Sequence, residues 1–229
     1  MIALTPLLLA IATALVMYQV SVWQTARTLD ANSSPLADPA LAPVLRRLAR
    51  ALDLGALDVH VYEIAPINGL AAPDGRIFIT RGLLDRFHRG EIAAEELVSV
   101  IAHEIGHVAL GHAKRRRIDF TGQNAIRVAL ATVLGRFIPG LGVLIANALA
   151  QLLAAHLSRQ DEFEADAYAA ALMVKAGIGT GPQTRLLEKL QHMSGVGGGR
   201  PVWLMSHPRT ADRIAAIRAL DDRWRGASG

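Results

Sequence analysis

Two histidines and a glutamate in the stretch VIAHEIGHVALGHAKRRR, residues 100–117, have the types and spacing that bind and activate a metal ion. In an α-helix, His103 and His107 are four residues apart and project side by side from one face. Glu104 then stands beside whatever the two imidazoles hold, where a general base takes a proton from water. Two adjacent buried histidines without a partner are costly, so this H-E-x-x-H pattern predicts a hydrolytic metal site rather than a structural pair.

The helix that carries the motif is expected over residues 91–111. Its apolar residues recur as one stripe against a core, namely Ile92, Leu97, Val100, Ile101, Ile105, Val108 and Leu110. A catalytic zinc takes three protein ligands, so a third must be found. His112 falls one position short of the spacing H-E-x-x-H-x-x-G-x-x-H, whose last Gly and His positions hold Leu110 and Ala113. We therefore expect His112 on the surface or beside a ligand, not on the metal.

A second helix, expected over residues 158–178, supplies carboxylates at helical spacing. Glu162 and Asp166 are four residues apart, so Glu162 can bind the metal while Asp166 accepts a hydrogen bond from a ligand histidine. A solvated acidic face, formed by Asp161, Glu162, Glu164 and Asp166, is the alternative. The H-E-x-x-H pair favours the site, with His103, His107 and Glu162 as ligands.

Four stretches in order resemble the M48 family of zinc metallopeptidases, which includes HtpX-like proteases and CAAX prenyl endopeptidases, many of them membrane-associated. They are GRIFITRGLL (75–84), EELVSVIAHEIGHVALGH (95–112), SRQDEFEAD (158–166) and SHPRTADRI (206–214). The family motif E-x-x-A-D has its first Glu as ligand, which falls on Glu162 rather than Glu164. The resemblance implies one Zn²⁺ per chain and a zincin-type (gluzincin) core.

The same resemblance places two further residues near the zinc. His207, in the S-H-P sequence, would either cap the open metal position at rest or donate a hydrogen bond to the oxyanion, and we favour the oxyanion role. Arg213 would hold that loop or bind substrate. The implied activity is zinc-dependent endopeptidase cleavage of misfolded or membrane-proximal polypeptides, with Glu104 as the general base. A latent zinc-binding, membrane-tethered adaptor or chaperone-like factor is the alternative.

The composition indicates contact with lipid. Of the 229 residues, 52% are hydrophobic, and residues 2–23 carry no charge over a length sufficient to span a bilayer. A cleaved signal peptide is the alternative, but no basic residue precedes the apolar stretch and no small-x-small cleavage site follows it. We expect a single-pass anchor at a bacterial inner membrane, with Arg27 and later arginines placing the catalytic part in the cytoplasm.

The predicted organisation is an anchor (1–24), a linker (25–43) and a metallopeptidase domain (44–225) with a hydrophobic insertion (128–157). The fold class is α+β, mainly α-helical, with an N-terminal transmembrane helix and a small antiparallel sheet beside the H-E-x-x-H helix. One strand is a candidate edge for pairing with extended substrate. It consists of Arg76, Ile77, Phe78, Ile79 and Thr80.

The net charge and the cysteine content restrict the classes of partner that we expect for this protein. The pI is about 9.9, but the sequence has no motif of interleaved aromatic and basic residues, so we expect no nucleic-acid partner. We attribute the basic run at 114–117 to contact with a membrane surface or to a solvated helix end. The absence of cysteine excludes a disulfide framework. Polypeptide substrates, membrane lipid and membrane partner proteins remain the expected partners.

Overall fold

The computed structural model describes most of the region that was expected to fold. The described residues are 16, 19–20, 23–72, 74–112, 136, 142–193, 203–204, 207 and 210–227. Most of the expected anchor at 1–24, the basic run at 114–117 and most of 128–141 lie outside them. Within the described part of the chain, none of the helices combines the length and the apolar character needed to cross a bilayer.

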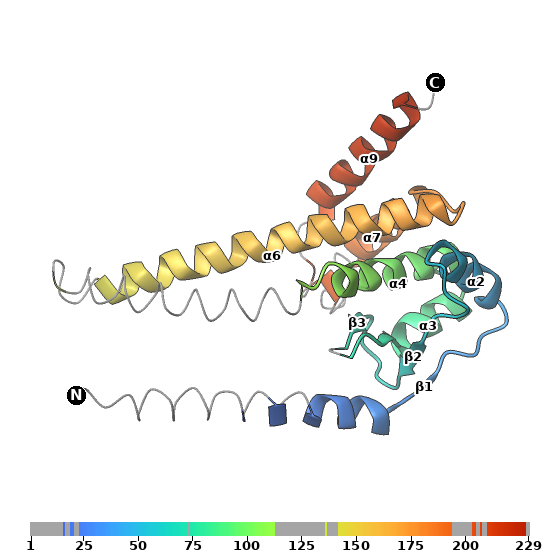
Figure 1. Ribbon diagram of the computed structural model, residues 1–229, viewed down its shortest axis with the longest axis horizontal. Helices are drawn as coiled ribbons and strands as arrows, with labels where there is room; N and C mark the ends of the chain where they lie inside the picture. The colour runs from blue at the N-terminus through green and yellow to red at the C-terminus, as the bar shows by residue number, and fades with distance from the viewer. Residues whose placement is uncertain are drawn as a thin grey trace.

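The helices confirm a mainly helical α+β fold. Figure 1 shows the long helix α6 running beside α4, with α9 leaning away from the body. The helices are α2 (Ala42–Ala51), α3 (Arg81–His88), α4 (Ala94–Ala109), α6 (Gly142–Lys175), α7 (Gly181–Met193) and α9 (Thr210–Ala227). The helix expected to begin at residue 158 is therefore the second half of α6, which begins sixteen residues earlier at Gly142.

The sheet differs from the expected antiparallel one. Its strands β1 (Ser33–Pro35), β2 (Val59–Tyr62), β3 (Gly69–Ala71) and β4 (Ile77–Thr80) lie in the order β1-β2-β4-β3. β1 pairs with β2 and β3 pairs with β4 antiparallel, but β2 and β4 are parallel, with Val59 opposite Ile77. The prediction of an antiparallel sheet was wrong because β4 has two partners. It pairs antiparallel with β3 on one side and parallel with β2 on the other.

The strand that was predicted to form an edge of the sheet is instead an interior strand. β4 lies between β2 and β3, and all four of its residues are buried. Ile77 and Ile79 face the main core, whereas Phe78 packs with Leu29 and Ala72 on the other side. Both faces and both sides of β4 are therefore covered, and β3 forms that end of the sheet in the described part of the chain.

Part of the segment expected to be a linker belongs to the fold. Residues 23–31 are helical, and Leu29 is only 4% exposed against the sheet. Ser33–Pro35 then forms β1, in which Ser34 pairs with Val61. The folded region thus begins before residue 44, because an apolar side chain and a short strand interrupt the polar, proline-containing composition.

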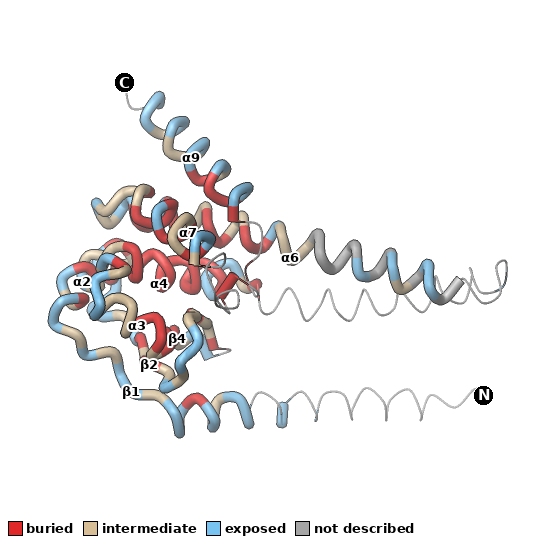
Figure 2. The backbone as a smooth tube through the Cα atoms, turned by 180° about the vertical axis from the view of Figure 1, so that it is seen from behind, coloured by how far each residue is buried: buried red, intermediate tan, exposed pale blue. Residues whose placement is uncertain are grey.

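The core is centred on α4, where every residue from 96 to 107 is buried (Figure 2). The α4 residues pack against the sheet, α2, α6 and α7. Two residues of the predicted apolar stripe do not join this core. Val108 and Leu110 are 39% and 37% exposed, because α4 ends at Ala109 and its last turn emerges from the covering elements.

Candidate metal centre

The two histidines of α4 meet at a buried point, as their spacing predicted. The Nε2 atoms of His103 and His107 are 3.1 Å apart, and the two residues are 1% and 8% exposed. Neighbouring ligand atoms around a tetrahedral zinc, each about 2.0–2.1 Å from the metal, lie roughly 3.3 Å apart. The imidazole nitrogens therefore already have the separation that a shared metal ion requires.

Helix α6 supplies the third group, Glu162. Its carboxylate oxygens lie 3.4 Å from His103 Nε2 and 3.5 Å from His107 Nε2. Glu164 faces elsewhere and contacts His112 instead. Among the described residues, His103, His107, Glu162 and His207 form one buried group able to hold a metal ion.

A close crossing of α4 and α6 makes this meeting possible. A Cβ atom on Gly106 would lie 2.9 Å from the carbonyl oxygen of Ala165 and 3.1 Å from its Cα. Real Cβ atoms are seldom so close to backbone, so the glycine inside H-E-I-G-H permits an approach that a larger residue would prevent. Glu162 lies three residues before Ala165, almost one turn away, and is thereby brought to the histidines.

Glu104 stands at the side of this group with one oxygen unused. Its side chain is buried, and among the described residues no group hydrogen-bonds its Oε1 atom. The Nε2 atom of His207 lies 3.6 Å from this oxygen. A buried carboxylate oxygen without a donor is costly unless a ligand or water completes it. This orphaned oxygen, beside two imidazoles and a carboxylate, fits a metal centre that activates water.

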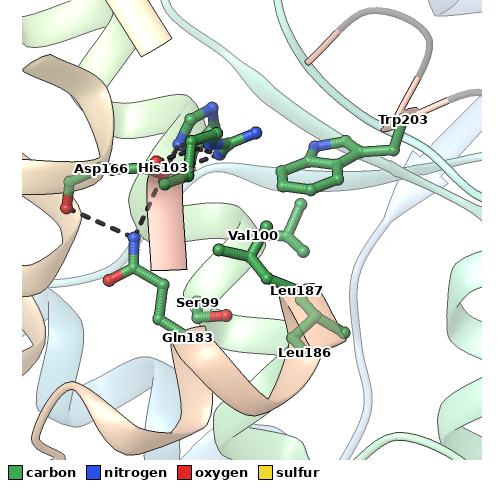
Figure 3. Close-up of a pocket in the computed structure, with 9 residues that line it drawn as sticks. Ser99, Val100, His103, Asp166, Gln183, Leu186, Leu187 and Trp203 are labelled. Carbon is green, nitrogen blue, oxygen red and sulfur yellow. Dashed lines mark hydrogen bonds and ion pairs between the residues drawn. The ribbon is translucent and has the colours of Figure 1, made fainter. Parts of the chain in front are cut away.

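Asp166 forms a hydrogen bond with His103. Its Oδ1 atom accepts a hydrogen bond from His103 Nδ1 at 2.9 Å, which leaves Nε2 facing Glu162. Arg213 donates to both oxygens of the same carboxylate at 2.6 and 2.7 Å. Gln183 of α7 adds a donor to Asp166 Oδ1 at 3.2 Å (Figure 3). Three elements thus hold the carboxylate that positions one ligand.

The electrostatics follow from this packing. Burial alone lowers the pKa of His103, but hydrogen bonds to Asp166 and Glu162 outweigh it and raise the pKa to about 9. Burial raises the pKa of Glu162, but its hydrogen bonds with His103 and His207 bring the pKa well below its usual range. For Asp166, Arg213 overcomes burial in the same way and lowers the pKa. Without metal, the site therefore favours ionised carboxylates and a cationic His103.

His207 and Arg213 lie beside the two histidines and Glu162. His207 Nδ1 is 2.6 Å from Glu162 Oε2 and 3.3 Å from His103 Nε2. Arg213 donates to the His207 carbonyl oxygen at 3.1 Å and is only 1% exposed. These contacts favour a role in holding the loop over substrate binding, because a buried guanidinium offers little surface to a substrate.

Three neighbours of the site were missed or left without a role. Gln183 contacts Asp166, and Trp203 lies with its ring centroid 5.6 Å from that of His103 (Figure 3). No motif marked either residue, since both come from segments far along the chain. His112 is fully buried against His107, so the expectation of a place beside a ligand holds and the surface alternative is wrong.

The wall behind His103 is closed. The cavity lined by Val100, His103, Gln183 and Trp203 among others has a volume of about 10 Å³, which accommodates about one water molecule. On another side, a Cβ atom on Gly69 would lie 3.5 Å from Glu104 Oε1. The edge strand β3 therefore borders Glu104, whereas β4 lies one strand further away.

A buried pair of histidines and a glutamate lie on crossing helices with a second glutamate beside them, an arrangement that fits a metallopeptidase site. Residues 35–221 match the model of peptidase family M48. The chain belongs to this family and is a metalloprotease.

Several relatives of this chain are named as proteases. The chain is 31% identical to metalloprotease LoiP of Escherichia coli over 78% of this chain and 68% of that protein. It is 30% identical to protease HtpX of Pseudomonas aeruginosa, covering 78% of this chain and 72% of the relative. An HtpX homolog of Paracidovorax citrulli is 28% identical over 91% and 81%.

Proposed function

We propose that the chain is a zinc-dependent endopeptidase that cleaves misfolded or membrane-proximal polypeptides, in protein quality control. The observation that carries the zinc assignment is the convergence of His103 Nε2, His107 Nε2 and the Glu162 carboxylate within 3.5 Å of one another. Two imidazoles and one carboxylate are a ligand set of catalytic zinc sites, with a fourth position left for water.

Each residue of the site then has its own role in hydrolysis. When bound, zinc supplies Lewis-acid polarisation of the scissile carbonyl and lowers the pKa of water. Glu104 takes the proton of the attacking water and passes it to the leaving amine, since its buried oxygen faces the site. Asp166 keeps His103 in the tautomer whose Nε2 faces the site.

The substrate backbone is proposed to pair with β3. This strand forms the end of the sheet next to Glu104, whereas the strand containing Arg76–Thr80 already has two neighbours. Pairing through main-chain groups binds extended polypeptides without demanding a sequence. Such a mode suits substrates whose chains have become partly unfolded.

We place the enzyme at the bacterial inner membrane, anchored once through residues 1–24 with its domain in the cytoplasm, where lipid and membrane proteins would be its partners. The uncharged stretch 2–23 supports the anchor, and the apolar segment 128–157 offers a second lipid contact. Deleting residues 1–24 should therefore release only part of the protein from membranes. Full solubility of the deletion variant without detergent would assign 128–157 to the protein interior.

The specific experiment compares wild type with Glu104→Gln. Glutamine keeps the size of the side chain but cannot act as a base, so casein cleavage should fall by about a hundredfold or more while zinc stays near one per chain. Glu162→Ala should lose both zinc and activity. Cleavage by Glu104→Gln at the wild-type rate would contradict the proposed mechanism.

A latent adaptor is the second candidate, and one observation favours it. His207 lies 2.6 Å from Glu162 and 3.6 Å from Glu104, so the ring contacts or approaches both carboxylates that hydrolysis would use. In an adaptor, wild type and Glu104→Gln would support the same biological activity. Loss of that activity in Glu104→Gln would favour the protease.

A further inference from the structure

His112 contacts the metal ligand His107, although it follows the H-E-x-x-H motif by five residues. The two Nδ1 atoms are 2.8 Å apart, and the rings meet at 73°. His112 is fully buried. Two imidazole nitrogens at this distance share one proton, so one ring donates and the other accepts.

The end of α4 brings His112 to this place. On a continuing helix, a residue five positions later would lie on a different face. The helix instead ends at Ala109, where the Leu110 N–H still donates to the Gly106 carbonyl. Gly111 then has φ of +66°, a left-handed conformation that glycine adopts readily. This turn redirects the chain so that the His112 ring returns to His107.

The direction of the hydrogen bond follows from the ligand role of His107. Its Nε2 atom faces His103 and Glu162, so the lone pair for a metal must be on Nε2 and the proton on Nδ1. That proton is donated to His112 Nδ1, which must accept. The proton of neutral His112 is then on Nε2.

Two carboxylates stand at that nitrogen. Glu164 Oε2 lies 3.3 Å and Asp161 Oδ1 lies 3.8 Å from His112 Nε2. Both belong to α6, on either side of the ligand Glu162, and Asp161 is 2% exposed. Negative charge at this position stabilises a proton on Nε2, since an ionised carboxylate only accepts hydrogen bonds.

We propose that His112 is a positioning residue for His107, and that Asp161 and Glu164 orient His112 in turn. The three residues form a two-step relay that fixes the tautomer of His107, whereas Asp166 fixes that of His103 in one step. The inference rests on the proposed zinc function and deepens it, because it names the residues that prepare the second histidine ligand.

The first test measures zinc affinity by chelator competition, on the full chain in detergent. His112→Leu removes the acceptor and should weaken zinc binding by about tenfold to a hundredfold. His112→Asn should stay close to wild type, since its Oδ1 atom replaces Nδ1 as the acceptor. Equal affinity in all three proteins, or equal losses in both variants, would overturn the relay.

A double-substitution cycle tests the second step. Asp161→Asn combined with Glu164→Gln should weaken zinc binding in wild type, because His112 Nε2–H loses its charged acceptors. In the His112→Asn background the same pair should have little effect. An equal loss in both backgrounds would mean that the carboxylates act on the metal by another route.

The turn offers a matched backbone control. Gly111 and Gly90 both have left-handed φ angles, +66° and +71°, and at neither would a Cβ come within 4 Å of another group of the described residues. Alanine at either position carries similar strain, but only Gly111→Ala disturbs His112. The relay therefore predicts weaker zinc binding for Gly111→Ala alone. Equal zinc affinity in the two variants would contradict the role of the turn.

Nitrogen NMR of ¹⁵N-histidine-labelled protein reads the tautomers directly. With zinc, His107 should carry its proton on Nδ1 and His112 on Nε2, and the opposite tautomer of His112 would refute the relay. Glu162→Ala separates the two proposals: if it binds zinc as wild type does, the proposed metal site itself fails. Two zinc ions per wild-type chain, one of them lost in His112→Leu, would replace the relay by a second metal site.

Discussion

Arg213 holds both carboxylate oxygens of Asp166, with Nε 2.6 Å from Oδ2 and Nη2 2.7 Å from Oδ1. The same Oδ1 atom lies 2.9 Å from His103 Nδ1. The helix α9 is thereby linked through one carboxylate to a metal ligand on α4. Both charged groups are buried, so a substitution that removes one of them leaves the other in the protein interior without its main partner.

Arg213→Met should therefore lower the free energy of unfolding by about 3–5 kcal/mol, since the buried Asp166 carboxylate loses its bidentate partner and keeps only His103 and Gln183. Zinc affinity should fall as well. Arg218→Met is the control on the same helix, because its ion pair with Glu188 is exposed and contributes about 1 kcal/mol or less. Denaturant unfolding of the metal-free proteins in detergent provides the measurement. Similar stabilities for the two variants would contradict a structural role for the buried pair.

His207→Ala tests whether that ring caps the site. The ring, with Nδ1 2.6 Å from Glu162 Oε2, lies close enough to the metal-binding group for either role. If it caps the site, the variant should keep its zinc and cleave an unstructured peptide faster than wild type. A fall in kcat of about a hundredfold with zinc retained would support the oxyanion role, which the family resemblance favoured. Unchanged kinetics would exclude both, and His192→Ala, on the exposed end of α7, serves as control.

Gly106→Ala tests the close crossing of α4 and α6. The added methyl group would meet Ala165 backbone at 2.9 Å, and the helices must separate to relieve the contact. We expect a loss of about 1–3 kcal/mol in stability, together with weaker zinc binding because Glu162 moves with α6. Gly55→Ala, where none of the residues that the structure describes lies within 4 Å of the new Cβ, should leave zinc affinity unchanged. Normal zinc affinity in Gly106→Ala would show that α6 tolerates the shift.

Glu96 predicts a pH dependence of stability away from the metal site. Burial raises its pKa, but hydrogen bonds from Lys189 at 2.6 Å and from the Ala93 N–H outweigh burial and leave the pKa below its ordinary value. A carboxyl with a depressed folded-state pKa stabilises the protein above its unfolded pKa of about 4.3, and this contribution is lost as pH falls further.

Glu96→Gln should thus be less stable than wild type by about 1–3 kcal/mol at neutral pH, with the difference shrinking at acidic pH. Unfolding free energies measured across that range test the sign. Glu91→Gln, whose ion pairs are partly exposed, should show a smaller difference. A constant difference at all pH values would mean that the Glu96 charge is not responsible.

Helical spacing along the chain was enough to group the residues that one helix presents on one face. The spacing of His103 and His107 requires them to lie side by side, and Glu162 and Asp166 share a face for the same reason. Helix periodicity is a local property of the backbone, so the residues within one element could be grouped correctly. Family resemblance then added His207 and Arg213, which local periodicity does not connect to the metal.

How those faces meet depends on the packing of the folded chain. The crossing at Gly106 selects Glu162 over Glu164, and the turn at Gly111 brings His112 back to a ligand. Spacing had excluded His112 from the metal, but it could not predict the path of the backbone beyond the end of α4.

The order of the strands across the sheet could likewise not be predicted from the alternation of residues within each strand. Strand β4 was taken for an edge because alternation reports the two faces of a strand and not its neighbours on either side. Contacts such as those of Asp166 with Gln183 and Arg213 join different helices. Their partners are set by long-range packing, because no repeat along the chain relates residues that lie on separate elements.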